Sequence, residues 1–325
     1  MKRRDILAIA GATTLASSLP AGAQPAMPVV GHLSAGSPAT SALSLARFRD
    51  GLKEGGYVEG RNVAIAFRWA EGSYERLPAL AAELAALKVA VIVAIGTPAA
   101  QAAKQATQLI PIVFQSGTDV VQSGLVASLS RPGGNATGVT FNVVQLSHKR
   151  LEVLRELVPN IRTVVYLHRP GAVPSDAQLA DVQAAARGMG LALQIVEARS
   201  ARDIESAFVQ LAERRPDGLL VAADWLFIVQ GAQIAALAAR HAIPAIYDFP
   251  TPVAAGGLVS YGPARDDLYR TLGVYTGRVL GGARPADLPV HQPTQFELVI
   301  NLKTARALGL TIPPAILVRA DEVIE

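Results

Sequence analysis

Hydroxyl, glycine and proline residues follow two short apolar runs near the N-terminal end of the chain. Ser34 and Ser37 follow the first run, and Gly96, Thr97 and Pro98 follow a later one. In open α/β sheets, ligands lie beyond the carboxyl ends of strands, where loops lead into helix N-termini. Hydroxyls and backbone N–H groups there could bind a carboxylate or phosphate, or simply cap a helix. Both interpretations stay open for the two serines, whereas the Gly-Thr-Pro sequence favours ligand contact.

Carboxylates occupy equivalent places after two other apolar runs. Ser116 and Asp119 follow one run, and Asp119 could accept hydrogen bonds from a ligand ammonium or cap the next helix. Asp224 follows another run, and Trp225 adds a flat apolar surface beside it. The pair could line a cleft, or it could be a helix N-cap next to a buried indole.

Three aromatic residues also lie at the ends of apolar runs: Phe141, Tyr247 and Tyr261. Tyr247 and Tyr261 could sandwich an apolar or aromatic ligand, or they could pack a hinge, and Phe141 is a further candidate for ligand binding. An acid near aromatic side chains, opposite a helix N-terminus, suits a zwitterionic amino acid. We therefore expect a small molecule, with an aromatic amino acid favoured; branched-chain amino acids and other small acids stay open.

The positions of these residues are set by the surrounding strands and helices. Short β-branched runs alternate regularly with longer segments of helical period, which predicts parallel sheets covered by helices. The expected strands are Val29–Leu33, Val63–Phe67, Val89–Ile95, Ile112–Phe114, Gly138–Phe141, Thr163–Leu167, Ala192–Val196, Gly218–Ala222 and Ala245–Tyr247. Leucines at 146, 151, 154 and 157 predict one of the amphipathic helices between them. The fold class is α/β.

One segment of the chain resembles another about 130 residues later. Residues 74–114 read as helix, apolar run, Gly-Thr-Pro, helix and a second apolar run, and residues 201–247 repeat this order with Asp224 and Trp225 in the loop. Such an internal repeat favours two similar lobes over one large sheet. A length of 325 residues is sufficient for two lobes, each with its own core.

The composition excludes several classes of protein. The net charge is only +4 and the basic residues are interspersed with acids, so we expect no nucleic-acid partner. The chain contains no cysteine, which excludes disulfides, thiolate metal sites, thiol catalysis and a lipid-bearing N-terminal cysteine. The five histidines lack metal-ligand spacing, so we expect no metal and no cofactor.

The usual signatures of α/β enzymes are also missing. The sequence contains no dinucleotide-binding glycine motif, phosphate loop, Gly-x-Ser-x-Gly elbow or His-Glu-x-x-His motif. We therefore expect a binding protein and not an enzyme. A ligand-sensing receptor lobe for a membrane signalling partner is the main alternative, and an exported α/β enzyme is a weaker one.

The N-terminal segment has the pattern of an export signal. Residues 1–23 begin with Lys2-Arg3-Arg4, continue with an apolar run and end in Ala21-Gly22-Ala23, which fits the rule for signal cleavage. The paired arginines also resemble the twin-arginine signal, although the general secretion route stays open. The apolar run is short for a membrane anchor. We expect cleavage near Ala23 and a periplasmic mature protein.

Several segments together resemble the ABC-transporter substrate-binding protein family that includes tryptophan- and tyrosine-binding members. They are FRDGLKEGGYVEGRNV at 48–63, RPGGNATGV at 131–139, KRLEVL at 149–154, GGLVSYG at 256–262, NLKTARALGLTIPP at 301–314 and RADEV at 319–323. The resemblance covers nearly the whole mature chain.

The resemblance implies a periplasmic-binding-protein fold of type I: two Rossmann-like lobes with parallel sheets and a ligand cleft between them. The chain would cross between lobes near Phe141–Ser147, Tyr247–Thr251 and Ala283–His291. Lobe 1 would then hold residues 28–143 and 250–284, and lobe 2 residues 144–249 and 285–325. The implied function is capture of a small molecule by lobe closure, as a monomer, for an ABC permease with its ATPase.

Overall fold

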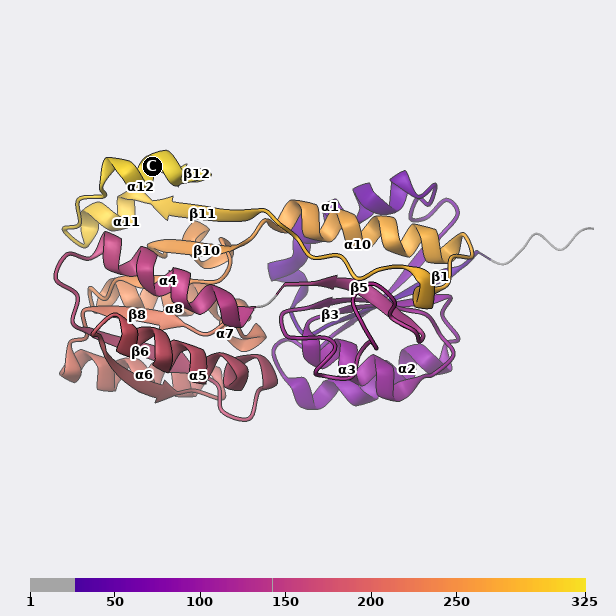
Figure 1. Ribbon diagram of the computed structural model, residues 1–325, viewed down its shortest axis with the longest axis horizontal. Coiled ribbons are helices and arrows are strands. Elements are labelled where there is room, and N and C mark those ends of the chain that lie inside the picture. Colours follow the sequence, from indigo (N-terminus) through magenta and orange to yellow (C-terminus); the bar gives the residue numbers. More distant parts are fainter. Residues whose placement is uncertain (1–26, 142) are drawn as a thin grey trace, which may run out of the picture.

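The computed structural model describes residues 27–141 and 143–325 and contains two α/β lobes arranged end to end (Figure 1). The predicted export signal at 1–23 lies outside the described residues. None of the helices in the described part of the chain combines the length and hydropathy that crossing a bilayer requires.

The first lobe contains a five-stranded parallel sheet of order β2-β1-β3-β4-β5. Its strands are β1 (Val29–Ser34), β2 (Ala64–Trp69), β3 (Val91–Ile95), β4 (Ile112–Ser116) and β5 (Ala136–Thr140). Strands β3 and β4 are buried along their whole length, as expected for parallel strands covered on both faces. The connecting helices are α1 (Pro38–Glu54), η1 (Tyr74–Arg76), α2 (Leu77–Ala86) and α3 (Thr97–Ala106).

The second lobe contains a seven-stranded sheet of order β12-β11-β10-β9-β8-β6-β7, in which only β11 runs antiparallel to a neighbour, β10. Its strands are β6 (Thr163–His168), β7 (Ala192–Glu197), β8 (Gly218–Val221), β9 (Ala245–Tyr247), β10 (Val259–Pro263), β11 (Phe296–Asn301) and β12 (Glu322–Ile324). Its helices are α4 (Val143–Leu157), α5 (Val173–Gly188), α6 (Ala201–Arg214), α7 (Trp225–Val229), α8 (Gly231–Arg240), α9 (Thr251–Ala254), α11 (Leu302–Ala307) and α12 (Pro314–Arg319).

Helix α10 (Arg265–Leu280) follows β10 of the second sheet but packs against α1 of the first lobe (Figure 1). Glycines line the contact on both sides: Gly51 in α1, Gly55 at the C-cap of α1, and Gly273 and Gly277 in α10. A Cβ atom on Gly51 would overlap the carbonyl oxygen of Arg270, and one on Gly273 would overlap that of Phe48. The missing side chains therefore allow the two helix backbones to touch.

The strand pairing moves the second crossover from the predicted Tyr247–Thr251 to Ala264. Strand β10 lies between β9 and β11, so the stretch 250–263, predicted for lobe 1, belongs with the second sheet. The stretch from 285 to His291, predicted for lobe 2, lies instead beside β5: Leu288 accepts a hydrogen bond from Thr137, and His291 bridges to Val139. The physical reason is that β9, α9 and β10 form one further β-α-β unit, which extends the second sheet.

The predicted strands and helices otherwise agree with the structure. All nine expected strands correspond to β1–β9, whereas β10, β11 and β12 were missed. The predicted amphipathic helix is α4, and its leucines at 146, 151, 154 and 157 are buried. The internal repeat corresponds to β3-α3-β4 in one lobe and to β8, α7, α8 and β9 in the other. In each unit the two strands are paired as neighbours.

Each lobe has its own hydrophobic core, and the two cores meet at the interface between the lobes. Four residues that follow strand ends of the second lobe, in loops or in α7, pack in the core of the first: Ala223, Trp225, Ile228 and Phe249. These loops follow β8 and β9, so the carboxyl ends of the strands form the surface where the lobes meet.

Candidate ligand-binding site

A cleft between the lobes is lined from both sides by residues at the carboxyl ends of strands. Its walls are Gly96, Thr97, Gln115, Gly117 and Phe141 of the first lobe, and Ala223, Trp225, Ile228, Asp248 and Phe249 of the second. The walls nearly touch, because the space between them is about 30 Å³, room for about two or three water molecules. This is the position in which the strand-end rule places a ligand.

The first lobe contributes a cluster of buried hydroxyls at the start of α3. The Thr97 hydroxyl lies 2.9 Å from that of Ser116 and 3.2 Å from that of Thr118, and it accepts a hydrogen bond from the backbone N–H of Gly117 at 3.2 Å. The Oε1 atom of Gln115 is buried without a hydrogen-bond partner among the described residues. Hydroxyls and a ten-residue helix N-terminus together favour a negatively charged ligand group here.

The second lobe contributes a buried carboxylate, Asp248, directly after β9. Burial raises its pKa to about 6, and the guanidinium groups of Arg150 and Arg265 limit this rise. Arg150 is itself fully buried: its Nε donates to the carbonyl of Tyr261 at 2.8 Å, and its Nη2 has no partner among the described residues. The cleft therefore carries an acid supported by cations on the side opposite the hydroxyl cluster.

Aromatic rings form the part of the cleft near the crossovers. Phe141 and Phe249 pack edge to face with ring centroids 6.1 Å apart. Arg265 lies over the Phe249 ring at 5.2 Å and donates hydrogen bonds to Thr251 of the second lobe and Ser44 of the first, each at 2.6 Å. One guanidinium thus fixes this wall and ties the two lobes together.

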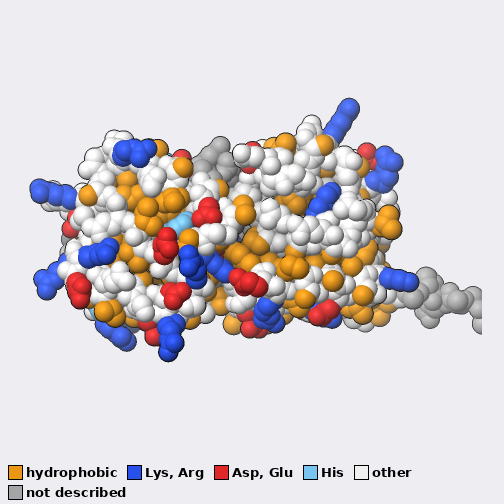
Figure 2. Space-filling view, turned by 90° about the horizontal axis from the view of Figure 1, so that it is seen from below, with side chains coloured by type: hydrophobic (Ala, Val, Ile, Leu, Met, Phe, Trp, Pro, Cys, Tyr) orange, Lys and Arg blue, Asp and Glu red, His pale blue; other side chains and the backbone are white. Residues whose placement is uncertain are grey.

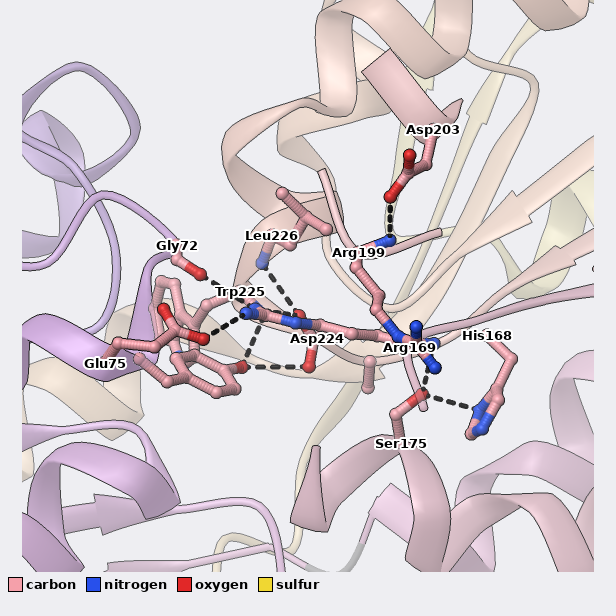
Figure 3. Close-up of polar contacts among 12 residues, drawn as sticks. Gly72, Glu75, His168, Arg169, Ser175, Arg199, Asp203, Asp224, Trp225 and Leu226 are labelled. Atoms are coloured by element: carbon pink, nitrogen blue, oxygen red, sulfur yellow. Dashed lines mark hydrogen bonds and ion pairs between the residues drawn. The ribbon is translucent and has the colours of Figure 1, made fainter. Parts of the chain in front are cut away.

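Beside the cleft, a polar network joins the lobes (Figure 3). The Tyr74 hydroxyl of the first lobe donates to Asp224 at 2.9 Å and accepts from the backbone N–H of Trp225 at 3.2 Å. Arg169 of the second lobe donates to the carbonyl of Gly72 at 2.7 Å, and its guanidinium lies 4.2 Å from the centre of the Tyr74 ring. We call Gly72, Tyr74, Arg169 and Asp224 the inter-lobe latch.

Burial governs the protonation of the latch. Burial raises the pKa of Asp224, opposed mainly by Arg169, which donates to its Oδ1 at 3.4 Å. Burial, and next the Asp224 carboxylate, raise the pKa of Tyr74, so the phenol keeps the proton it donates. Asp224 also caps α7 through the N–H of Leu226 at 2.9 Å.

A serine, a histidine and an aspartate lie next to one another behind the latch, and Figure 3 shows the serine and the histidine of this group. Ser175 Oγ is 2.9 Å from His168 Nδ1, and His168 Nε2 is 3.2 Å from Asp176. The serine is completely buried, however, and its Oγ accepts a hydrogen bond from the backbone N–H of Arg169 at 3.0 Å. These contacts fix the loop that carries Arg169 and do not expose a nucleophile.

Figure 2 shows one face of the molecule, on which acidic and basic side chains gather near the junction of the lobes. A wider hollow of about 540 Å³ lies between the two lobes, lined by Gln101, Thr118, Asp119, Gln122, Ser123, Val173 and Ala177. Thr118 also belongs to the hydroxyl cluster and contacts Thr97 of the cleft wall, so this hollow lies next to the cleft. Among the described residues, no group of three His, Asp or Glu side chains is placed to hold a metal ion.

Four of the predicted site residues line the cleft: Gly96, Thr97, Phe141 and Trp225. Two others lie directly behind the wall. Ser116 supports Thr97 through its hydroxyl, and Asp224 belongs to the latch.

The remaining predicted site residues lie elsewhere. Three of them fill local roles at helix or turn starts: Ser34 accepts from the N–H of Gly36, Ser37 caps α1 in a capping box, and Pro98 lies in the first turn of α3. The exposed Asp119 caps its own turn and lines the hollow next to the cleft. Tyr247 is buried in the core of the second lobe, and Tyr261 stacks on Phe296 with ring centroids 6.1 Å apart.

Sequence reasoning missed Gln115, Gly117, Ala223, Ile228, Asp248 and Phe249. A signal for Asp248 was present, because side chains alternate between faces at the end of a strand. If Tyr247 faces the core, its neighbour must face the other way.

Comparison with known proteins agrees with this geometry. A family model described as ABC transporter substrate binding protein matches residues 38–324. A tyrosine-binding protein of Clostridioides difficile (strain R20291) is 29% identical over 263 residues, which cover 81% of this chain and 75% of the relative.

Two solved structures add a comparison in three dimensions. The ABC domain from Streptococcus pneumonia in complex with L-Trp is 30% identical, with a TM-score of 0.83 over 91% of this chain and 99% of that one. The ligand-free, open structure of a substrate-binding protein with adhesive properties from Clostridium difficile covers the same shares at 25% identity, with a TM-score of 0.64.

These relatives are solute-binding proteins, and the family predicted from sequence motifs is confirmed. The two lobes and the strand-end cleft are consistent with a match over 38–324. This chain belongs to the ABC transporter substrate-binding protein family.

Proposed function

We propose that this chain is the solute-binding protein of an ABC importer and that it captures a small molecule, an amino acid and preferentially an aromatic one, by closing its two lobes. The observation that carries the proposal is the pairing of Asp248 on one wall of the cleft with the hydroxyl cluster and α3 N-terminus on the other. An α-ammonium and an α-carboxylate require groups of these two kinds.

Each part of the ligand has a matching wall. Asp248 would accept hydrogen bonds from the α-ammonium, and the Thr97 hydroxyl and the α3 N-terminus would donate to the α-carboxylate. The side chain would lie among Phe141, Trp225 and Phe249, where aromatic pairs gain stabilisation beyond their buried area. The tyrosine- and L-Trp-binding relatives support an aromatic side chain.

Binding and closure are then coupled in the usual way. A ligand that touches both lobes binds the closed arrangement more tightly than the open one, so it shifts the population toward closure. The three crossovers absorb the change in backbone angles. The closed protein would deliver its ligand to a permease with its ATPase. The export pattern at 1–23 supports cleavage near Ala23 and a periplasmic location. We further propose that the mature protein is a monomer.

A thermal-shift screen of the purified protein tests the proposal, using amino acids, small carboxylates, nucleosides and sugars. A ligand at about 100 times its dissociation constant adds about 2.7 kcal/mol to the free energy of unfolding, which raises Tm by several degrees. We expect saturable stabilisation by tyrosine, phenylalanine or tryptophan, with the compound recovered unchanged. Stabilisation by sugars or nucleosides alone would contradict the assigned ligand class, and consumption of the compound would indicate an enzyme.

A further inference from the structure

The indole of Trp225 lies across the lobe boundary. Trp225 begins α7 of the second lobe, yet it packs in the core of the first lobe and is 7% exposed. A Cβ atom on Gly36 would lie 2.8 Å from Cζ3 and 2.9 Å from Cε3 of the indole, and one on Gly96 would overlap its Nε1. A side chain at either position would therefore collide with the indole. The two glycines leave the space in which the ring packs, and we call this surface, formed by Gly36 and Gly96, the indole seat.

The seat is held in place by the latch. The backbone N–H of Trp225 donates to Tyr74, and the preceding Asp224 accepts from Tyr74, Arg169 and Leu226. The indole therefore cannot leave Gly36 and Gly96 by a small shift of its own loop without breaking buried hydrogen bonds. Its position is set by both lobes together.

The same indole forms a wall of the cleft, close to the surfaces that would receive a ligand side chain. Phe141, Ile228 and Phe249 line the cleft with it, and the remaining space is about 30 Å³. A tryptophan side chain is among the largest that a cleft wall can carry. A ligand therefore requires the walls to separate, and the size and seat of the indole then limit how large a ligand side chain fits beside it.

We propose that Trp225 is the specificity-determining residue of the cleft: its indole, seated on Gly36 and Gly96, sets the upper size of the ligand side chain. The inference rests on the proposed function and names the property by which the site selects among amino acids. Discrimination by size in an apolar pocket reaches about 10- to 200-fold per methylene-sized change, so removal of an indole has a measurable effect.

Isothermal titration with alanine, leucine, phenylalanine, tyrosine and tryptophan tests this inference on the wild type, Trp225→Ala and Trp225→Phe. We expect the affinity for tryptophan relative to leucine to rise at least tenfold in Trp225→Ala, with Trp225→Phe in between. The reason is that the space vacated by the indole is available only to a large side chain.

Gly36→Ala provides a change in the opposite direction. Gly36 lies outside the left-handed region, unlike Gly96 with its φ of +99°, so the added methyl group strains the indole and not the backbone. We expect the displaced ring to narrow the cleft, so that the affinity for tryptophan relative to leucine falls. The matched control is Leu226→Ala, which removes apolar volume from the same helix without altering the cleft wall.

The outcomes separate the two proposals. If Trp225→Ala weakens the binding of all five amino acids equally, the indole contributes to lobe closure alone and the inference is overturned. The inference is also overturned if the affinity for tryptophan relative to leucine is unchanged in both Trp225→Phe and Gly36→Ala. If the wild type binds none of the five amino acids, the proposed function is wrong and the inference falls with it. Tight wild-type binding with an unchanged ratio overturns the inference alone.

Discussion

At the scale of single residues, Asp248 is the group whose charge decides what the cleft can hold. It is almost completely buried, and burial raises its pKa to about 6 while Arg150 and Arg265 oppose the rise. A carboxyl with a raised pKa stabilises the fold most below its ordinary pKa, and this contribution is lost as pH rises through about 6. The ionised form is therefore costly in the free protein, and a ligand ammonium would offset that cost.

We predict that affinity for the amino-acid ligand falls as pH decreases below about 6. Asp248 then becomes neutral while the ligand ammonium keeps its charge, so the dissociation constant should rise about tenfold per pH unit well below 6. In Asp248→Asn the affinity at pH 7 should fall by about 10- to 100-fold. Calorimetry between pH 4.5 and 7 checks both expectations.

The Asn variant is also the control for this pH dependence. Its affinity should be nearly constant over the same range, because the titrating carboxyl is gone. A wild-type affinity that does not change with pH, or an Asn variant that keeps the wild-type slope, would remove Asp248 from the ligand ammonium.

At the scale of elements, the contact between α1 and α10 is what assigns a late segment of the chain to the first lobe. The glycines at 51, 55, 273 and 277 bring the two backbones into contact. Larger residues would separate the helices and expose the face of the sheet that α10 covers. The second crossover at Ala264 thus depends on small residues on both helices.

We predict that Gly51→Ala destabilises the protein by about 1 to 3 kcal/mol, because the added methyl group meets the backbone of Arg270, which cannot rotate away. Gly188→Ala is the matched control in the last turn of α5, where a Cβ atom meets nothing within 4 Å. It should instead stabilise by about 0.5 to 1 kcal/mol through helix propensity and unfolded-chain entropy. Urea unfolding checks both signs, and equal effects would show that the glycine contact is unimportant.

At the scale of the whole molecule, two lobes with separate cores are held together by the latch, by Arg265 and by the indole of Trp225. The closer match to the L-Trp complex, with a TM-score of 0.83, than to an open ligand-free relative, at 0.64, is consistent with lobes that lie close together. The balance between open and closed lobes should then depend on single buried hydrogen bonds.

We predict that Tyr74→Phe shifts this balance toward the open arrangement. The change leaves Asp224 and the N–H of Trp225 without their hydroxyl partner, which costs about 1 to 3 kcal/mol in the closed protein. Ligand affinity should fall by about 5- to 100-fold, and small-angle scattering of the ligand-free variant should give a larger radius of gyration than the wild type.

Tyr275→Phe is the control, because its hydroxyl donates to Pro289 within the first lobe. It should change neither the affinity nor the radius of gyration. The same result for Tyr74→Phe would mean that the latch does not contribute to closure.

The sequence by itself determined the fold class and much of the framework. Short β-branched runs separated by helical periods identified β1–β9, because strand and helix periodicity are local properties of the chain. The strand-end rule found Gly96, Thr97, Phe141 and Trp225, because every strand end in a parallel sheet opens toward the same edge. The motifs then identified the family, which the match over 38–324 confirms.

Only the tertiary structure decided which strand-end residues face the cleft. Ser37 and Asp119 have the same chemistry as true cleft residues, but their donors and acceptors are used in capping. Asp248 and not Tyr247 faces the cleft, because the orientation of β9 in its sheet turns the aromatic ring into the core. The placement of β10, the α1–α10 contact and the indole seat also depend on residues far apart in sequence, and local patterns carry no information about such contacts.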